Sequence, residues 1–140
     1  MRIAIATALV LAGCAVVPVG GPYTEATMMP LATDLTKLTA AVESTLLYAP
    51  LAARLPDDQL LSSSVADDPG LLAPFRHYQL QVSRAAGHVA LLVCSPDGRQ
   101  ALLEDAGCTA AMDRHRWRDQ PPGPCTFTLD LQQTCAVTTK

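Results

Sequence analysis

Four cysteines in the second half of the chain are the residues best suited to chemistry: Cys94, Cys108, Cys125 and Cys135. Four thiols could form two disulfides, hold a zinc ion or build a redox centre. Zinc sites usually take their ligands as close pairs, whereas these cysteines are separated by 14, 17 and 10 residues. The chain also has no Cys-x-x-Cys pair of the kind found in thioredoxin-like centres. The spacing therefore predicts two disulfides and no metal or cofactor.

The strands expected around these cysteines limit how they can pair. Cys94 and Cys108 are expected near opposite ends of a strand, and so are Cys125 and Cys135, whereas a disulfide needs Cα atoms within about 7 Å. If the last strand lies antiparallel to the one before it, Cys108 pairs with Cys125 and Cys94 pairs with Cys135. A parallel last strand would exchange the partners. We predict the antiparallel arrangement, in which each closed loop contributes roughly 3 kcal/mol to stability.

The beginning of the chain has the features of an export signal. Arg2 supplies a positive charge, and Ile3 to Leu11 form a run of nine mostly apolar residues, which is the size of a signal-peptide core. Extending the run to Val19 gives 17 residues, but the run then includes Pro18 and is shorter than the roughly 20 residues of a spanning helix. We therefore expect export rather than a permanent membrane span.

Residues Leu11-Ala12-Gly13-Cys14 resemble the lipobox of bacterial lipoproteins. The resemblance implies that the signal is cut before Cys14 and that its thiol becomes a thioether to diacylglycerol. Acyl chains such as palmitate, at about 0.8 kcal/mol per buried CH2, would then hold the protein on a membrane. Ala15 stands where an Asp would favour the inner membrane, so the resemblance implies the outer membrane, facing the periplasm. The alternative is an ordinary secretory signal cut elsewhere.

Composition narrows the remaining possibilities. Of the 140 residues, 49% are hydrophobic and 16% charged, and the formal net charge is -3. This excludes a disordered acidic chain and argues against a nucleic-acid partner, which would need a basic surface. We divide the chain into a signal peptide at 1–13, a lipidated cysteine and tether at 14–29, and a single periplasmic domain at 30–140.

Helices are predicted in the first half of that domain. Within residues 30–49 the apolar side chains recur every three or four positions, which indicates an amphipathic helix. Pro50 closes this helix because it disfavours helical geometry at the residue before it. A second, short helix is predicted to begin at Pro56.

Strands are predicted in the second half. Residues 78–83 alternate between apolar and polar, and residues 88–94 are almost wholly apolar, as expected for a strand covered on both faces. A third strand is predicted at 100–104 and a last one at 125–131. The fold class is therefore α+β, with an N-terminal amphipathic helix and a short second helix packed on an antiparallel sheet of about four strands.

The segment between the second and third of these cysteines contains the best candidate for a partner-binding surface. Its candidate residues are Arg114, His115, Arg116, Trp117 and Arg118. Tryptophan and arginine are favoured at interface centres because they combine contact area with directional donors. The competing interpretation is that Trp117 fills the edge of the core while the arginines pair with nearby acidic side chains.

The histidines do not suggest catalysis. His77, His88 and His115 are scattered along the sequence, and none has a serine or carboxylate partner at a recognisable spacing. We predict no catalytic residue and expect a non-enzymatic lipoprotein of the cell envelope that binds or scaffolds another envelope component. Two alternatives stay open: an inhibitor of a periplasmic hydrolase such as a lysozyme or protease, and a hydrolase of unrecognised type.

Overall fold

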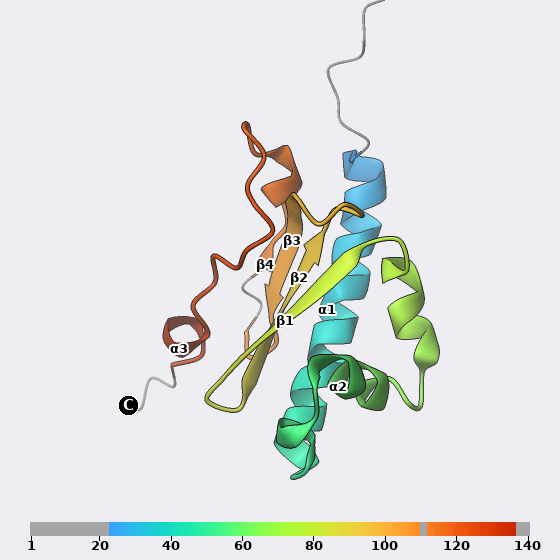
Figure 1. The fold of residues 1–140 in the computed structure, drawn as a ribbon, viewed down its shortest axis with the longest axis vertical. Coiled ribbons are helices and arrows are strands. Elements are labelled where there is room, and N and C mark those ends of the chain that lie inside the picture. Colours follow the sequence, from blue (N-terminus) through green and yellow to red (C-terminus); the bar gives the residue numbers. More distant parts are fainter. Residues whose placement is uncertain (1–22, 110–111, 137–140) are drawn as a thin grey trace, which may run out of the picture.

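The computed structural model describes residues 23–109 and 112–136, and its helices lie around one antiparallel sheet (Figure 1). The helical elements are α1 (Glu25–Tyr48), η1 (Ala52–Arg54), α2 (Asp57–Ser64), η2 (Pro69–Phe75), η3 (Arg116–Arg118) and α3 (Leu131–Thr134). The strands are β1 (Gln79–Ala85), β2 (His88–Cys94), β3 (Ala101–Ala106) and β4 (Met112–Asp113). The predicted α+β class is confirmed.

The four strands form a meander in the order β1-β2-β3-β4, with each strand antiparallel to its neighbours. The β1–β2 hairpin turns at Ala86 and Gly87, whose φ angles are 54° and 81°. Positive φ at two successive residues suits the twist of a tight hairpin, and glycine adopts it without a steric cost. The turn thus sets a register in which Val82 faces Leu91.

Both faces of the sheet are covered, and β2 contributes to each. Val89, Leu91 and Val93 belong to the large core cluster beneath α1, which lies along one face (Figure 1). The alternate residues Ala90 and Leu92 pack instead against side chains of the segment 125–135 on the other face. Burial on both sides explains why this strand is apolar at successive positions, as the sequence indicated.

The long helix begins earlier than predicted. It starts at Glu25 rather than at Pro30, because Thr24 and Thr27 form a capping box that satisfies backbone donors of the first turn. Pro30 lies inside the helix on an exposed side. The predicted end is confirmed, since the helix stops at Tyr48 and Ala49 is extended.

The predicted last strand at 125–131 is wrong. Residues 125–130 form no strand, α3 begins at Leu131, and the fourth strand is the short β4. The backbone N–H groups of Thr128 and Leu129 donate to the side chain of Glu104 at 2.8 and 2.7 Å instead of to a neighbouring strand. The alternating pattern correctly marked the apolar side chains that pack on the sheet, among them Phe127.

Two disulfides are present, but the predicted pairing is wrong. The bridges are Cys94–Cys125 and Cys108–Cys135, each with Cα atoms 5.7 Å apart. The segment 125–135 runs in the same direction as β3, so Cys125 lies where β3 begins and Cys135 lies where it ends. This is the parallel case in which the partners are exchanged. The exclusion of neighbour pairs, Cys94 with Cys108 and Cys125 with Cys135, is confirmed.

Within residues 23–109 and 112–136, no helix has both the length and the apolar character that crossing a bilayer requires. The signal peptide, the lipobox and Cys14 lie outside the described residues, so their assignment stays a prediction from the sequence.

Candidate binding surface

The segment 114–118 lies beside β3, but not all of it is available to a partner. Arg116 is only 4% exposed, and its Nη1 donates at 3.0 Å to Oε2 of the fully buried Glu104. The same nitrogen donates to the carbonyl oxygen of Thr126 at 2.8 Å. A buried, paired guanidinium cannot make new contacts without losing these bonds. Arg116 is therefore a structural residue, and its place among the binding candidates is corrected.

Glu104 organises the whole C-terminal segment. Its Oε1 accepts the backbone N–H groups of Thr128 and Leu129, and its Oε2 accepts the Thr128 hydroxyl at 2.8 Å as well as the Arg116 guanidinium. A buried carboxylate is tolerated when its charge is paired and its lone pairs are filled by donors. Four hydrogen bonds on one carboxylate thus hold two loops against the sheet.

Trp117 combines both interpretations weighed from the sequence. It is half-buried and packs against the core cluster beneath α1, while its Nε1 donates to the carbonyl oxygen of Arg114 at 2.8 Å. The guanidinium of Arg118 lies over its ring, 4.6 Å from the ring centroid, and also pairs with Glu25 of α1. The indole is thus clamped on several sides, and its remaining edge reaches the surface.

Arg114 and His115 are exposed and border a hollow of about 420 Å³. The other lining residues are Met112, Asp113 and Leu129. The backbone N–H of His115 donates to the Asp113 side chain at 2.9 Å, which shapes the turn that presents both side chains. A cationic side chain beside apolar groups suits contact with a protein surface that carries a carboxylate.

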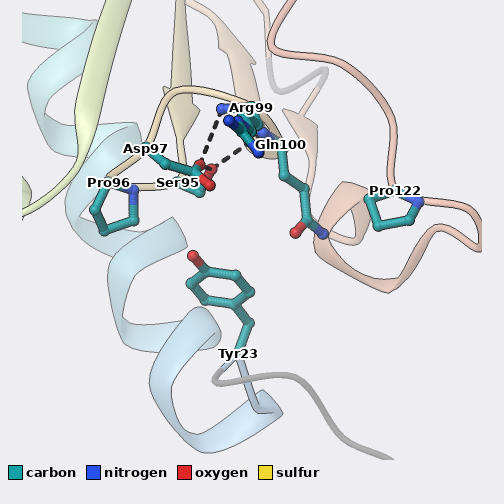
Figure 2. Close-up of a pocket in the computed structure, with 7 residues that line it drawn as sticks. All are labelled: Tyr23, Ser95, Pro96, Asp97, Arg99, Gln100 and Pro122. Atoms are coloured by element: carbon teal, nitrogen blue, oxygen red, sulfur yellow. Dashed lines mark hydrogen bonds between the residues drawn. The ribbon is translucent and has the colours of Figure 1, made fainter.

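A second hollow, of about 590 Å³, lies between the start of α1 and the β2–β3 turn (Figure 2). It is lined by Tyr23, Ser95, Pro96, Asp97, Arg99, Gln100 and Pro122. In Figure 2 the Tyr23 ring extends from the start of α1 toward the turn, and Gln100 points into the space between Tyr23 and Pro122. Gln100 Nε2 donates at 3.3 Å to the carbonyl oxygen of Trp117, which links this hollow to the segment 114–118.

The turn that forms one wall of this hollow holds a negative charge. Oδ1 of Asp97 accepts the Ser95 hydroxyl at 2.5 Å and the backbone N–H of Arg99 at 3.0 Å. The Ser95 hydrogen bond, followed by that of Arg99, lowers the pKa of Asp97. Burial raises the pKa of Tyr23, and the charges of Tyr78 and Asp97 add to the effect. The hollow thus presents a neutral phenol facing a carboxylate.

Asp105 lies under α1, on the opposite face of the sheet from Glu104. Its side chain is buried, with only 3% of the residue exposed, and burial raises its pKa to about 6. A hydrogen bond with Thr39 and the positive charge of Arg114 lower the pKa and so offset part of this rise. The positive charge of Arg114, one residue of the candidate surface, therefore acts on a buried carboxyl group whose pKa is raised.

Replacing Asp105 with asparagine is expected to stabilise the protein above pH 6. The folded pKa of about 6 exceeds the unfolded value of 3.8, so the folded state holds the extra proton between them and stability falls as pH rises through this window. We expect a gain of about 1–3 kcal/mol at pH 7.5, where the buried carboxylate is charged, and little at pH 4. Urea unfolding at the two pH values measures it. A gain that does not change with pH would contradict this assignment.

The buried carboxylates were missed from the sequence. Glu104 ends the predicted strand 100–104 and Asp105 follows it directly, and charged residues beside the apolar residues of that strand could have indicated these buried groups. Glu43 was also missed: it lies on the buried side of α1, with Oε1 2.5 Å from Nδ1 of His88. Nothing local in the sequence brings Glu43 and His88 together, because 45 residues separate them.

Comparison of the chain with models of protein families, with curated proteins and with solved structures found no significant match to any of the three.

Proposed function

We propose that this protein is a non-enzymatic lipoprotein of the cell envelope whose domain binds another envelope protein through a surface made by Arg114, His115, Trp117 and Arg118. The main support for this proposal is that buried contacts hold the exposed side chains of this surface in place. A buried ion pair and a clamped indole hold exposed Arg114 and His115 in place, so a partner would meet a preformed site. Preformed sites lose less conformational freedom on binding.

The resemblance to a lipobox supports a partner that lies close to a membrane. Arg118 pairs with Glu25 at the start of α1, and only 11 residues separate Glu25 from Cys14. A fully extended chain of that length spans at most about 40 Å. With Cys14 lipidated, Glu25 at the start of α1 would stay within about 40 Å of the bilayer. The binding surface would lie close to Glu25, because Arg118 pairs with it. A membrane-associated protein that presents a carboxylate to Arg114 and an apolar surface to Trp117 fits this position.

Site-specific photocrosslinking in intact cells tests the proposal. A photoreactive residue at position 115 should crosslink to one envelope protein, and the same residue at exposed position 67 should not. Arg114→Glu should lower the yield at least about fivefold, since it reverses the charge at the interface, whereas Arg54→Glu, at another exposed arginine, should leave it unchanged.

Cys14→Ser supplies the second arm of this experiment. The unlipidated chain should leave the membrane fraction, keep its melting temperature and lose the crosslink at position 115. If Cys14→Ser has the same membrane fractionation and protein mass as the wild type, the lipid anchor is contradicted.

In the crosslinking experiment, equal yields from positions 115 and 67 would contradict the proposed binding surface. Stoichiometric inhibition of a lysozyme or protease would instead support the inhibitor alternative.

A further inference from the structure

An imidazole lies beside the sulfur atoms of one of the two disulfides. The Sγ atoms of Cys108 and Cys135 and a ring nitrogen of His88 all lie within 4.8 Å of one another. All three residues are half-buried, so small molecules can reach them from solvent. The cysteines are joined to each other, so the cluster presents an oxidised sulfur pair next to a group that can donate a proton.

Glu43 holds the imidazole in this position. Nδ1 of His88 donates to Oε1 of Glu43 at 2.5 Å, and Oε2 accepts the backbone N–H of Val89 at 2.9 Å. The Glu43 side chain is only 8% exposed. A carboxylate on one ring nitrogen fixes the orientation of an imidazole. His88 is thus oriented, in the way that a proton-transferring histidine requires.

Gly107 makes room for this arrangement. A Cβ atom at this position would lie 2.8 Å from both Cβ and Oε2 of Glu43, which is too close for any side chain. The backbone N–H of Gly107 also donates to the carbonyl oxygen of Val89 at 2.8 Å. The close approach brings Cys108, the next residue, to the end of the sheet where β2 begins with His88.

The other disulfide has no such neighbour among the contacts of the described residues. Cys94 is fully buried, and the side chain that contacts Cys125 Sγ is the amide of Gln81, whose Nε2 lies 3.1 Å away. An amide can donate a hydrogen bond but does not give up a proton near neutral pH. The two bridges therefore differ in proton supply, and they differ in access at one sulfur, since Cys94 is fully buried whereas Cys125 is half-buried like Cys108 and Cys135.

We propose that Cys108–Cys135 is a thiol–disulfide exchange site for a dithiol reductant, with His88 as the proton donor to the departing sulfur. A thiolate of the reductant attacks one sulfur of the bridge, the S–S bond breaks, and its electron pair passes to the other sulfur, which takes a proton from His88. The second thiolate of the reductant then attacks the mixed disulfide and frees the first cysteine, which takes up a proton from solvent. Two electrons and two protons pass to the bridge, and the reductant leaves as a disulfide.

The exchange would change how the C-terminal segment is held. Cys135 follows α3 directly, and Leu131 of α3 packs against Ala90 and Ala106 on the sheet. With the bridge open, α3 keeps the packing of Leu131 on the sheet and the hydrogen bonds of its own turn, and Glu104 still holds Thr128 and Leu129 just before it. Reduction would therefore loosen the end of the chain after Leu131, while Glu104 and the Cys94–Cys125 bridge still hold the segment before it.

The rates at which the two bridges open give a direct test. The purified full-length chain is treated with dithiothreitol at pH 7, quenched with an alkylating reagent at set times, and analysed by peptide mass spectrometry. We expect Cys108–Cys135 to open about tenfold faster than Cys94–Cys125. His88→Gln, which gives this bridge the same kind of neighbour that Gln81 is for the other, should slow its opening about tenfold and change the other bridge less than about twofold.

Two further variants separate proton transfer from general loosening. In His88→Ala, added imidazole should restore part of the lost rate at Cys108–Cys135 and none at Cys94–Cys125. Glu43→Gln, which keeps the side chain's size, should slow the same bridge by a smaller factor than His88→Gln. An unchanged rate at Cys108–Cys135 in His88→Gln would overturn the proposal, and so would an equal rate change at both bridges.

Discussion

Replacing Glu104 with alanine is expected to lower the free energy of unfolding by about 3–5 kcal/mol, because it leaves Arg116 charged and buried without its partner. The substitution also removes the acceptor for the backbone N–H groups of Thr128 and Leu129. Partly buried donors that lose their acceptor add to the cost. Urea denaturation at pH 7, followed by circular dichroism, measures the change through the midpoint and the slope.

Glu25→Ala is the matched control. Glu25 pairs with Arg118, which lies in the same segment as Arg116, but both side chains of this pair are about half exposed. An exposed ion pair contributes between about 0.2 and 1 kcal/mol, so this variant should change stability little. The double variant Glu104→Ala with Arg116→Ala should lose less than the sum of the single losses, because no charge is left unpaired. Equal effects of Glu104→Ala and Glu25→Ala would show that Glu104 does not organise the segment.

Removing Cys94–Cys125 with two alanine substitutions is expected to cost about 3–4 kcal/mol. The bridge closes a loop of 31 residues, and opening it restores that loop's freedom in the unfolded chain. In a domain of this size the melting temperature should fall on the order of 10 °C. A thermal scan followed by circular dichroism, under conditions that keep Cys108–Cys135 intact, measures it.

Non-reducing peptide mapping is the companion measurement for this prediction. Wild-type protein should yield peptides joined through Cys94 and Cys125, and through Cys108 and Cys135. The single variants Cys94→Ala and Cys125→Ala should lose the same joined peptide, while the other bridge remains. A joined peptide containing Cys94 and Cys135 would restore the antiparallel pairing and contradict the path of the C-terminal segment.

The Glu104–Arg116 ion pair and the Cys94–Cys125 disulfide both support the proposed binding surface. Arg116 donates to the carbonyl oxygens of Thr126 and Pro124, the residues on either side of Cys125. The ion pair with Glu104 and the bridge from Cys94 therefore hold the same short stretch of chain. Weakening either one should loosen Trp117 and Arg114 along with it. Binding would then be lost without any change in the surface residues themselves.

Local patterns in the sequence were enough for most of the regular elements. The apolar run of β2 indicated a strand covered on both faces, and the predicted bounds 88–94 match it. The end of α1 followed from Pro50, and the start of α2 followed from Pro56. Each of these features depends on residues within a turn or two of one another, so spacing and backbone preference carry the information.

Contacts between distant residues decided the path of the C-terminal segment, the disulfide pairing and the burial of Arg116. The alternation at 125–131 is the same for a strand and for an extended segment laid across a sheet, and Glu104, more than 20 residues away, accepts the N–H groups that a strand would have paired. The disulfide pairing followed from that path. In the sequence nothing distinguishes Arg116 from Arg114 and Arg118. Only the tertiary structure buries Arg116 beside Glu104. The sequence by itself determined the apolar faces of α1 and β2, the end of α1 and the start of α2. Only tertiary packing decided which charges are buried and which cysteines meet, because those partners are set by the path of the chain rather than by local spacing.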